Sequence, residues 1–525
     1  MVTDIHAVEN GTCVTSDICI IGSGAAGITL AREFLNCQAT VTVLEAGGKV
    51  FEASSQDPYK SEVIGLPHGG IHHGRVRQLG GSTTLWAGQA LPFFPIDFEK
   101  REWIPYSGWP ITREELLPFY YRAEEVMQIP HVKNDENGWP VGKLPPPPYT
   151  PGSVVNYFSQ FTTTPNFVQK YGELIATAKN VSLLTHGNVT SLEANATATA
   201  LDKVIVRALD GHSIHVKARF FVVCCGGIES ARLLLLSDSV ESHGIGNRYD
   251  VVGRYFQDHP GVGVPVRPIA GSSFHEFYDS YRLKGIRHSI KVVASDELQR
   301  SEAITHIGGE IYYPPNEEDS IVAAKELLKI ARHPHRLSEL PSAMGKVIRN
   351  PSRVITAAYR HYVRKMPPSV ASTEPMLGFG GEQEPNPESR ITLSSDVDAL
   401  SKRRTVLNWR MTRNDVRSME VYLRVLAAEW RRLGIAILEA DRVELAGRET
   451  GASGGFVDAN HHMGTTRMGE NPRYSVVDSH CRVHGYGNLY IGSASVFPTG
   501  SFSNPTLTVL ALSLRIADEL KQQLE

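Results

Sequence analysis

Apolar runs bounded by glycine open the chain. Residues 17–21 form a short run rich in isoleucine, and residues 22–27 follow with three glycines. Apolar positions then recur at helical spacing through Leu30 and Phe34, and a second apolar run covers residues 40–44. Short, mainly apolar runs predict buried strands, and apolar residues spaced three to four apart predict a helix between them. We therefore expect a β-α-β unit, which is typical of a parallel sheet.

Further strands and a buried terminal helix are predicted from later parts of the chain. Residues 181–225 contain β-branched and aromatic runs, such as 204–206 and 220–223, which indicate strands returning to the first sheet. The last apolar segment starts at Pro505, a favourable residue for the first turn of a helix. It has almost no polar face before Arg515, so we expect this helix to be buried.

The region 271–454 has the pattern of a second domain. Strand-like runs occur at 391–393 and 406–409, and helical spacing extends over 415–433. Within it, residues 321–365 predict a basic helical insertion.

The insertion is interrupted by Pro334, Pro341 and Pro351. It carries ten lysines or arginines against two glutamates, a local excess of eight positive charges. A basic amphipathic stretch can bind a membrane or a partner protein, but a solvated, salt-bridged face is the favoured interpretation.

Composition narrows the class of protein. The 525 residues favour two packed domains, and 41% apolar with 21% charged residues is an ordinary globular balance. Lys+Arg 53 and Asp+Glu 56 leave a net charge of −3, so the surface offers no field for nucleic acid or an anionic membrane. Small neutral molecules are therefore the expected partners, and the oligomeric state stays open.

The cysteines indicate reduced thiols. They are scattered, with no CxxC and no metal-type Cys/His spacing, so neither a disulfide framework nor a metal site is expected. No stretch resembles a signal peptide or reaches the length of a membrane span, and we expect a cytoplasmic protein. The adjacent Cys224 and Cys225 are interpreted as core residues before a glycine turn, not as a redox pair. The six positions are Cys13, Cys19, Cys37, Cys224, Cys225 and Cys481.

The glycines of the first unit match a dinucleotide-binding fingerprint. Gly22 permits the tight turn, Gly24 lets the backbone approach a pyrophosphate at the helix N-terminus, and Gly27 lets helix and strand pack closely. Glu45 follows Gly24 by about 20 residues, the distance at which an acid binds a ribose hydroxyl pair. A hexapeptide alone can be mere turn chemistry, but the flanking strands, the helix and the acid favour nucleotide binding.

The fingerprint does not separate NAD from FAD. Residues 72–88 form a glycine-rich run with hydroxyls and one indole, able to place backbone donors along an extended phosphate and ribityl chain. The alternative interpretation is a surface loop with an arginine-rich edge.

Near the C-terminus, His461 and Asn504 suit the oxidation of an alcohol. A neutral imidazole can take the hydroxyl proton, and an amide can hold the same oxygen. No side chain accepts hydride, so the chain must also carry an organic acceptor. The alternative for Asn504 is an N-cap of the final helix.

Taken together, these motifs resemble the glucose-methanol-choline (GMC) oxidoreductases, which are FAD-dependent enzymes. Besides the fingerprint and the closing histidine and asparagine segments, the resemblance rests on residues 80–82, 225–235 and 257–260 in the family's order, over nearly the whole chain. Residues 107–111 and 488–500 are similar to the sugar-oxidising branch, which includes pyranose 2-oxidases and C-glycoside 3-oxidases.

The resemblance implies an α/β fold with two discontinuous domains. Residues 14–95, 175–270 and 455–525 would form a Rossmann-like FAD-binding domain. Residues 96–174 and 271–454 would form an α+β substrate-binding domain built on an antiparallel sheet, with the insertion inside it.

The same resemblance implies the cofactor contacts. The three fingerprint glycines would hold the FAD pyrophosphate, Glu45 the adenosine ribose and Val189 the adenine. Leu85 stands where covalently flavinylated relatives carry histidine, so we expect non-covalent FAD. Many members have aspartate at the position of Ser493. The full set of implied contacts is Gly22, Gly24, Gly27, Glu45, Gly80, Gly81, Ser82, Trp86, Ala87, Val189, Ser493, Ala494, Pro505 and Thr506.

For the reaction, the resemblance makes His461, three residues before Gly464, the base, and leaves His462 a structural role. Asn504 would orient the oxygen while hydride passes to flavin N5, and the N-terminus of the final helix would stabilise the negative charge that develops there. His259 is interpreted as structural.

The expected reaction is oxidation of a secondary hydroxyl of a sugar or glycoside to a ketone, with oxygen or a quinone as electron acceptor. Oxidation of a non-sugar alcohol and a non-redox lyase remain alternatives.

Overall fold

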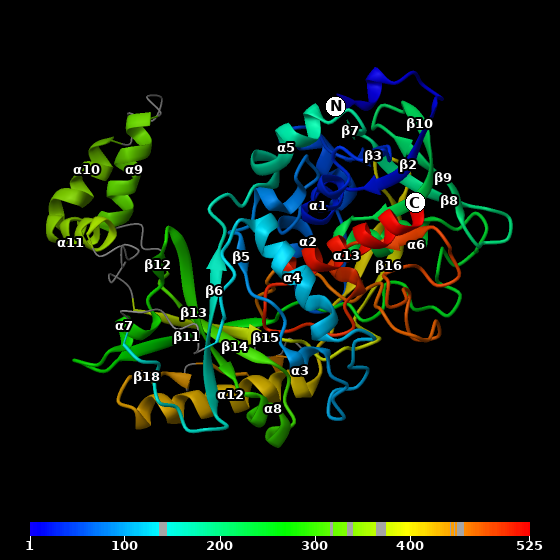
Figure 1. The fold of residues 1–525 in the computed structure, drawn as a ribbon. Helices are drawn as coiled ribbons and strands as arrows, with labels where there is room; N and C mark the ends of the chain where they lie inside the picture. Colours follow the sequence, from blue (N-terminus) through cyan, green and yellow to red (C-terminus); the bar gives the residue numbers. More distant parts are fainter. Residues whose placement is uncertain are drawn as a thin grey trace.

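Two large sheets organise the chain, one mainly parallel and one antiparallel (Figure 1). In this computed structural model the described residues are 1–135, 144–314, 319–332, 340–363, 374–440, 443–445, 447–448 and 456–525.

The first sheet has the strand order β1-β7-β3-β2-β10-β9-β8, and β19 pairs with β10. All neighbours from β1 to β10 are parallel, as is β19, whereas β9 and β8 join the sheet antiparallel. The strands are β1 (Val2–Asp4), β2 (Cys13–Ile21), β3 (Val41–Leu44), β7 (Val181–Thr185), β8 (Asn188–Ala194), β9 (Leu201–Arg207), β10 (Ser213–Val223) and β19 (Leu489–Ile491).

The predicted β-α-β unit is confirmed as β2, α1 (Ala25–Glu33) and β3. The buried terminal helix is confirmed as α13 (Thr506–Leu524), which packs against α1 and α4 (Arg113–Met127). The apolar side chains of α13 belong to the same core as the parallel sheet, and packing against α1 and α4 removes them from water.

The second sheet is antiparallel throughout and has the order β18-β11-β15-β14-β13-β6-β5, with β12 paired to β13. One of its faces packs on α12 (Arg413–Arg432), which confirms the helix predicted at 415–433. The strands are β5 (Gln89–Ala90), β6 (Val154–Phe161), β11 (Gly261–Pro268), β12 (Tyr281–Leu283), β13 (Ile286–Ala294), β14 (Ile307–Tyr312), β15 (Met376–Gly381) and β18 (Ala436–Leu438).

The strands predicted at 391–393 and 406–409 belong to a small third sheet. They form β16 (Arg390–Val397) and β17 (Arg403–Asn408), and β17 pairs in parallel with the two-residue strand β4 (Glu62–Val63). They therefore lie outside the large antiparallel sheet.

The basic insertion is helical, as predicted, and its helices stand apart from the rest of the chain in Figure 1. They are α9 (Ser320–Arg332), α10 (Leu340–Arg349) and α11 (Pro351–Tyr362). Pro341 and Pro351 each lie in the first turn of a helix, where proline is tolerated, and Pro334 lies outside the described residues.

The remaining helices connect these parts. They are α2 (Gly70–His73), α3 (Pro95–Phe98), α5 (Phe167–Thr177), α6 (Gly226–Leu236), α7 (Phe274–Tyr278) and α8 (Asp296–Glu302), with 3-10 turns η1 (Ile5–Ala7), η2 (Ser54–Tyr59), η3 (Gly81–Thr84) and η8 (Ala494–Val496). Over the part of the chain that the structure describes, no helix is both long and apolar enough to cross a membrane.

Candidate active site

A cavity of about 580 Å³ opens at the carboxyl ends of the parallel strands β2, β3 and β10. Its wall begins where these strands end, at Ile21, Leu44 and Cys224, and continues through His461 and Asn504. In an open parallel sheet this edge is where ligands bind, and the volume suits a large cofactor.

The fingerprint glycines divide into two kinds. Gly22 has φ +103°, and a Cβ on Gly27 would lie 1.9 Å from the Gly22 carbonyl oxygen, so these two let the strand, turn and helix pack. Gly24 is the N-cap of α1 and lines the cavity, with no atom within 4 Å of a Cβ built there. Gly24 is therefore the glycine that leaves room for a ligand.

Glu45 lies at the end of β3 on the cavity wall and is held by the loops on both sides. Its Oε2 accepts hydrogen bonds from the backbone N–H and the hydroxyl of Ser23, at 3.1 and 2.6 Å, and Oε1 accepts from Gly47 N–H at 2.9 Å. Burial raises the pKa of Glu45 despite these bonds. The carboxyl is thus fixed in position beside the turn at Gly22–Gly24.

Most of the other predicted cofactor residues also line the cavity, and two do not. Gly80 adopts φ +92° in a turn, where a Cβ would lie 2.6 Å from Val168, and Gly27 lies behind the wall. The hydroxyl of Ser493 bonds within the protein, to Ser495 Oγ at 2.6 Å. The predicted residues that reach the wall are Gly22, Gly24, Glu45, Gly81, Ser82, Trp86, Ala87, Val189, Ser493, Ala494, Pro505 and Thr506, together with His461 and Asn504.

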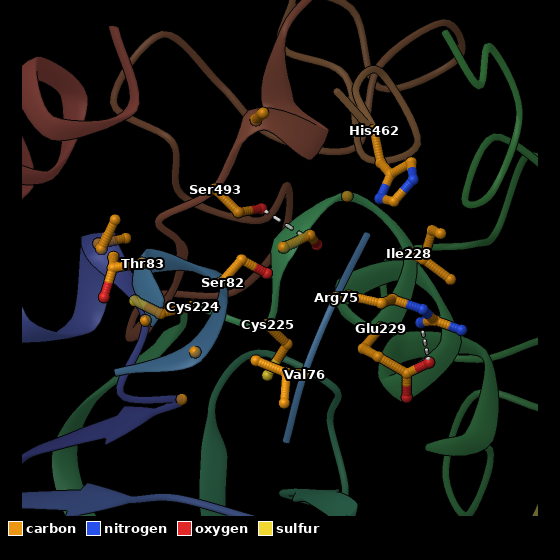
Figure 2. Close-up of a pocket in the computed structure, with 18 of the residues that line it drawn as sticks. Arg75, Val76, Ser82, Thr83, Cys224, Cys225, Ile228, Glu229, His462 and Ser493 are labelled. Carbon is orange, nitrogen blue, oxygen red and sulfur yellow. Dashed lines mark hydrogen bonds and ion pairs between the residues drawn. The ribbon is translucent and has the colours of Figure 1, made fainter. Parts of the chain in front are cut away.

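An ion pair on the wall was not predicted. Arg75 donates to Glu229 at 2.7 Å (Figure 2). Its guanidinium also lies 4.0 Å from the ring centroid of Tyr59. Both charged residues occur in motifs that the sequence singled out, but they lie far apart along the chain, so their contact carried no local signal. Cys224 and Cys225 line the same wall, and burial raises the pKa of Cys225 to about 12.

His461 and Asn504 meet at the wall. The Nδ2 atom of Asn504 lies 3.3 Å from Nε2 of His461. The N-cap position of α13 is occupied by Pro505, and the Asn504 side chain contacts the histidine rather than the first turn of the helix. Burial lowers the pKa of His461, so its imidazole is neutral at neutral pH and can accept a proton.

The tautomer of His461 follows from its two contacts. An amide nitrogen only donates, so Nε2 of His461 accepts from Asn504 and carries no hydrogen. The ring hydrogen is then on Nδ1, which lies 3.0 Å from Nδ1 of His259. His259 accepts this bond, so the histidine interpreted as structural from the sequence touches the candidate base.

His462 has different surroundings. Its ring packs on Phe256 and His68, at 6.0 and 5.3 Å between centroids, and burial lowers its pKa to about 3. Its Nε2 is 3.9 Å from Oδ2 of Asp258. These contacts agree with a structural role, although the ring also reaches the cavity wall (Figure 2).

Asp258 ties this histidine segment together. Its Oδ1 accepts backbone N–H groups of His259, Ala459 and His461 at 2.6, 3.2 and 3.0 Å, and Oδ2 is 3.0 Å from Nε2 of His68. Burial opposes ionisation, but the bond from His68 holds the pKa of Asp258 well below its usual range.

His68, Asp258 and His462 bring ligand atoms within 4.8 Å of one another, a spacing that could suit a metal. However, His68 Nδ1 accepts the N–H of Ile71 at 3.1 Å. The neutral ring then carries its hydrogen on Nε2 and donates it to Asp258. The group is thus a hydrogen-bonded brace for the segment that carries His461.

Comparisons with known proteins agree with this site. A family model described as GMC oxidoreductase matches residues 385–513, and one described as FAD dependent oxidoreductase matches residues 17–275. The chain belongs to the GMC oxidoreductase family.

Full-length relatives of this GMC oxidoreductase support the same conclusion. The fructose dehydrogenase large subunit of Gluconobacter japonicus is 25% identical, over 98% of this chain and 99% of the relative. Paromamine 6'-oxidase of Streptomyces fradiae is 24% identical, over 95% and 90%. The crystal structure of pyridoxine 4-oxidase from Mesorbium loti shares the fold, with a TM-score of 0.55 and 18% identity over 96% and 99% of the two chains.

The cavity of this GMC oxidoreductase fits FAD. The open space at Gly24 would take the pyrophosphate, and Glu45, on the same wall, would bind the ribose hydroxyls. When bound, FAD supplies the acceptor for hydride, which no side chain can. Pro505 and Thr506 bring the N-terminus of α13 to the wall, where the helix dipole favours negative charge. His461 and Asn504 are then placed to deprotonate and hold a hydroxyl.

Proposed function

We propose that this GMC oxidoreductase oxidises a secondary hydroxyl of a sugar or glycoside to a ketone. The observation that carries the proposal is the 3.3 Å approach of Asn504 Nδ2 to His461 Nε2 on the wall of the FAD cavity. A hydroxyl that takes the place of this contact can donate its proton to Nε2 of His461 and accept a hydrogen bond from Nδ2 of Asn504.

Each residue has one task in this reaction. The neutral imidazole of His461 takes the hydroxyl proton at Nε2, and Asn504 fixes the oxygen so that the carbinol hydrogen faces the acceptor. His259 holds the ring of His461 in the tautomer whose Nε2 carries no hydrogen. The N-terminus of α13 stabilises the negative charge that arrives with the hydride.

The sugar class is supported by the relatives and by two sequence runs. Two full-length relatives are named for the oxidation of fructose and of paromamine, and the sequence runs at 107–111 and 488–500 are similar to the sugar-oxidising branch. The relatives include both a dehydrogenase and an oxidase by name, so either a quinone or oxygen suits as the electron acceptor.

Anaerobic mixing of the purified holoenzyme with sugars, glycosides and simple alcohols tests the proposal. Bleaching of the flavin absorbance by sugars, with a ketone product, is the expected result. Bleaching only by simple alcohols would establish a non-sugar alcohol as substrate, and no bleaching by any of them would indicate a non-redox enzyme. Reoxidation of the bleached protein by oxygen or by a soluble quinone then identifies the acceptor.

We also propose that FAD is held without a covalent bond. Leu85, which precedes Trp86 in the glycine-rich loop, lines the cavity and offers no nucleophile to the flavin. Acid precipitation followed by filtration should release all the yellow colour into the filtrate. Colour that stays with the precipitated protein would contradict this.

A further inference from the structure

A group of polar side chains, here called the polar wall, lies on one face of the antiparallel sheet. We define it as five side chains from four neighbouring strands: Gln89 on β5, Ser159 on β6, Ser289 and Lys291 on β13, and Glu310 on β14. Strand pairing brings them together, since Ser289 is opposite Ser159 and Lys291 is opposite Glu310.

This wall is not an ordinary solvent-facing sheet surface. Alternate residues of the same strands, such as Phe158, Ile290 and Val292, point the other way into the core. On the polar side, Ser159 is fully buried and Ser289 is 6% exposed, and the Lys291 side chain is 12% exposed. Burying a charged pair is costly unless something compensates for the loss of water, so its presence calls for a role.

The wall faces the site. Gln89 lines the same cavity as His461 and Asn504. Gly308, two residues before Glu310, lies against the ring of Phe502, where a Cβ would come within 2.7 Å. Phe502 is two residues before Asn504, so this face of the sheet contacts the segment that carries Asn504.

Its hydrogen bonds converge on one atom. Oε2 of Glu310 accepts from Gln89 Nε2 at 3.1 Å and from Ser289 Oγ at 3.0 Å, and pairs with Lys291 Nζ at 3.0 Å. Within the described residues Oε1 of Glu310 makes no such bond, and the side chain is 32% exposed. Oε1 can therefore accept a further hydrogen bond, and the ammonium of Lys291 beside it has hydrogens left to donate. Both amide hydrogens of Gln89 are engaged, with Glu310 and with Ser159 Oγ at 2.7 Å, so its amide oxygen is the group it offers to a ligand.

We propose that Glu310, Lys291 and Gln89 bind the hydroxyl groups that flank the one being oxidised, and so select a neutral polyhydroxylated ring over a simple alcohol. This rests on the proposed function. A hydroxyl both donates and accepts, so neighbouring hydroxyls can donate to Glu310 or Gln89 and accept from the ammonium of Lys291. The wall carries one positive and one negative group, which disfavours both anionic and cationic substrates.

Lys291 also keeps Glu310 ionised. Burial alone would raise the pKa of this carboxyl, but the adjacent ammonium lowers it below the usual value. An ionised acceptor gives a stronger hydrogen bond to a sugar hydroxyl than a neutral amide can.

Binding without turnover tests the wall directly. The holoenzyme is reduced with dithionite under anaerobic conditions, so that no ligand can be oxidised, and is titrated calorimetrically with D-glucose, methyl β-D-glucopyranoside and D-fructose. Cyclohexanol serves as a ring with a single hydroxyl. At least one sugar should bind the wild type, and Glu310→Gln and Lys291→Met should each weaken that binding by about 10- to 100-fold while changing cyclohexanol by less than about 2-fold.

The control is Glu99→Gln, which breaks an exposed ion pair with Arg300 outside the cavity and should leave sugar binding unchanged. Gln89→Leu is a second wall variant in case the charged pair proves necessary for folding. The proposal is overturned if no sugar binds the wild type, or if the folded wall variants bind sugar as the wild type does. A sugar that binds but never bleaches the oxidised flavin would refute the proposed reaction, whereas the proposal that the polar wall binds sugar would still hold.

Discussion

The Nδ1 atoms of His461 and His259 lie 3.0 Å apart, although the two residues belong to different segments. Burial lowers the pKa of both rings, to about 3 for His259, so both are neutral and only one can donate across this contact. The contact of Asn504 with the opposite nitrogen of His461 decides the direction. His259 thereby keeps the basic nitrogen of His461 turned to the cavity.

Replacing His259 with Leu should slow flavin reduction by about 10- to 100-fold, part of the roughly 10²- to 10⁴-fold that a positioned base supplies. The cause is loss of the acceptor that fixes the His461 tautomer. Anaerobic stopped-flow at several substrate concentrations should show a lower limiting rate with an unchanged dissociation constant. His259→Asn, whose oxygen can accept the same bond, should retain more of the rate. Equal losses in both variants would mean that His259 only fills space.

The fingerprint glycines give opposite predictions for two similar substitutions. Gly27→Ala places a methyl 1.9 Å from the Gly22 carbonyl oxygen, so the apoprotein should lose about 1–3 kcal/mol or more of stability. Gly24→Ala meets no atom within 4 Å, so the apoprotein should unfold as the wild type does. Its methyl should nevertheless weaken FAD binding by about 10-fold or more, because it occupies the space for the pyrophosphate.

Thermal unfolding of the apoproteins and titration with FAD separate the two effects. A Gly24→Ala protein that binds FAD with the affinity of the wild type would show that the pyrophosphate lies elsewhere.

The buried histidines predict acid sensitivity. Burial lowers the pKa values of His259 and His462 from 6.5 to about 3, so the unfolded chain takes up protons that the folded chain does not. The contribution of these two rings to the free energy of unfolding is therefore fully present above pH 6.5. It is lost as the pH drops toward 3, by about 1.4 kcal/mol per pH unit for each ring. Asp258, with its lowered pKa, adds loss in the same direction at more acidic pH.

Urea unfolding at pH 7, 5.5 and 4.5 measures this slope, and His462→Phe should reduce it because one of the two rings is gone. Stability that is unchanged between pH 7 and 4.5 would contradict the neutral state of these rings. The charged or titratable groups that act on them are Asp258, His461, Lys291, His68 and Arg75.

The parts of the fold that could be predicted are those set by local geometry. The turn from Gly22 to Gly27 needs glycine for steric reasons, and the runs on either side have the period of strand and helix, so the unit is visible within thirty residues or so. Helix 415–433 could be predicted in the same way from its helical spacing. The structure adds a capping box of Thr412 and Asp415 that fixes its start.

What could not be predicted depends on contacts between distant segments. Alternation marks 391–393 and 406–409 as strands but says nothing about their partner, and β4, which pairs with β17, has only two residues. The approach of His461 to Asn504 was expected from family resemblance alone. Three further contacts join segments that are far apart along the chain: His259 with His461, Arg75 with Glu229, and the residues of the polar wall. Hydrophobic periodicity reports only on local structure, so it cannot predict them.

The central claim is that His461 is the base of a flavin-dependent alcohol oxidation. Anaerobic stopped-flow reduction of His461→Ala, beside His462→Ala and the wild type, tests it most directly. The account predicts that His461→Ala keeps its FAD but is reduced about 10²- to 10⁴-fold more slowly than the wild type, while His462→Ala retains most of its rate. The claim is contradicted if the His461→Ala flavin is reduced at the wild-type rate, or if the large loss occurs in His462→Ala instead.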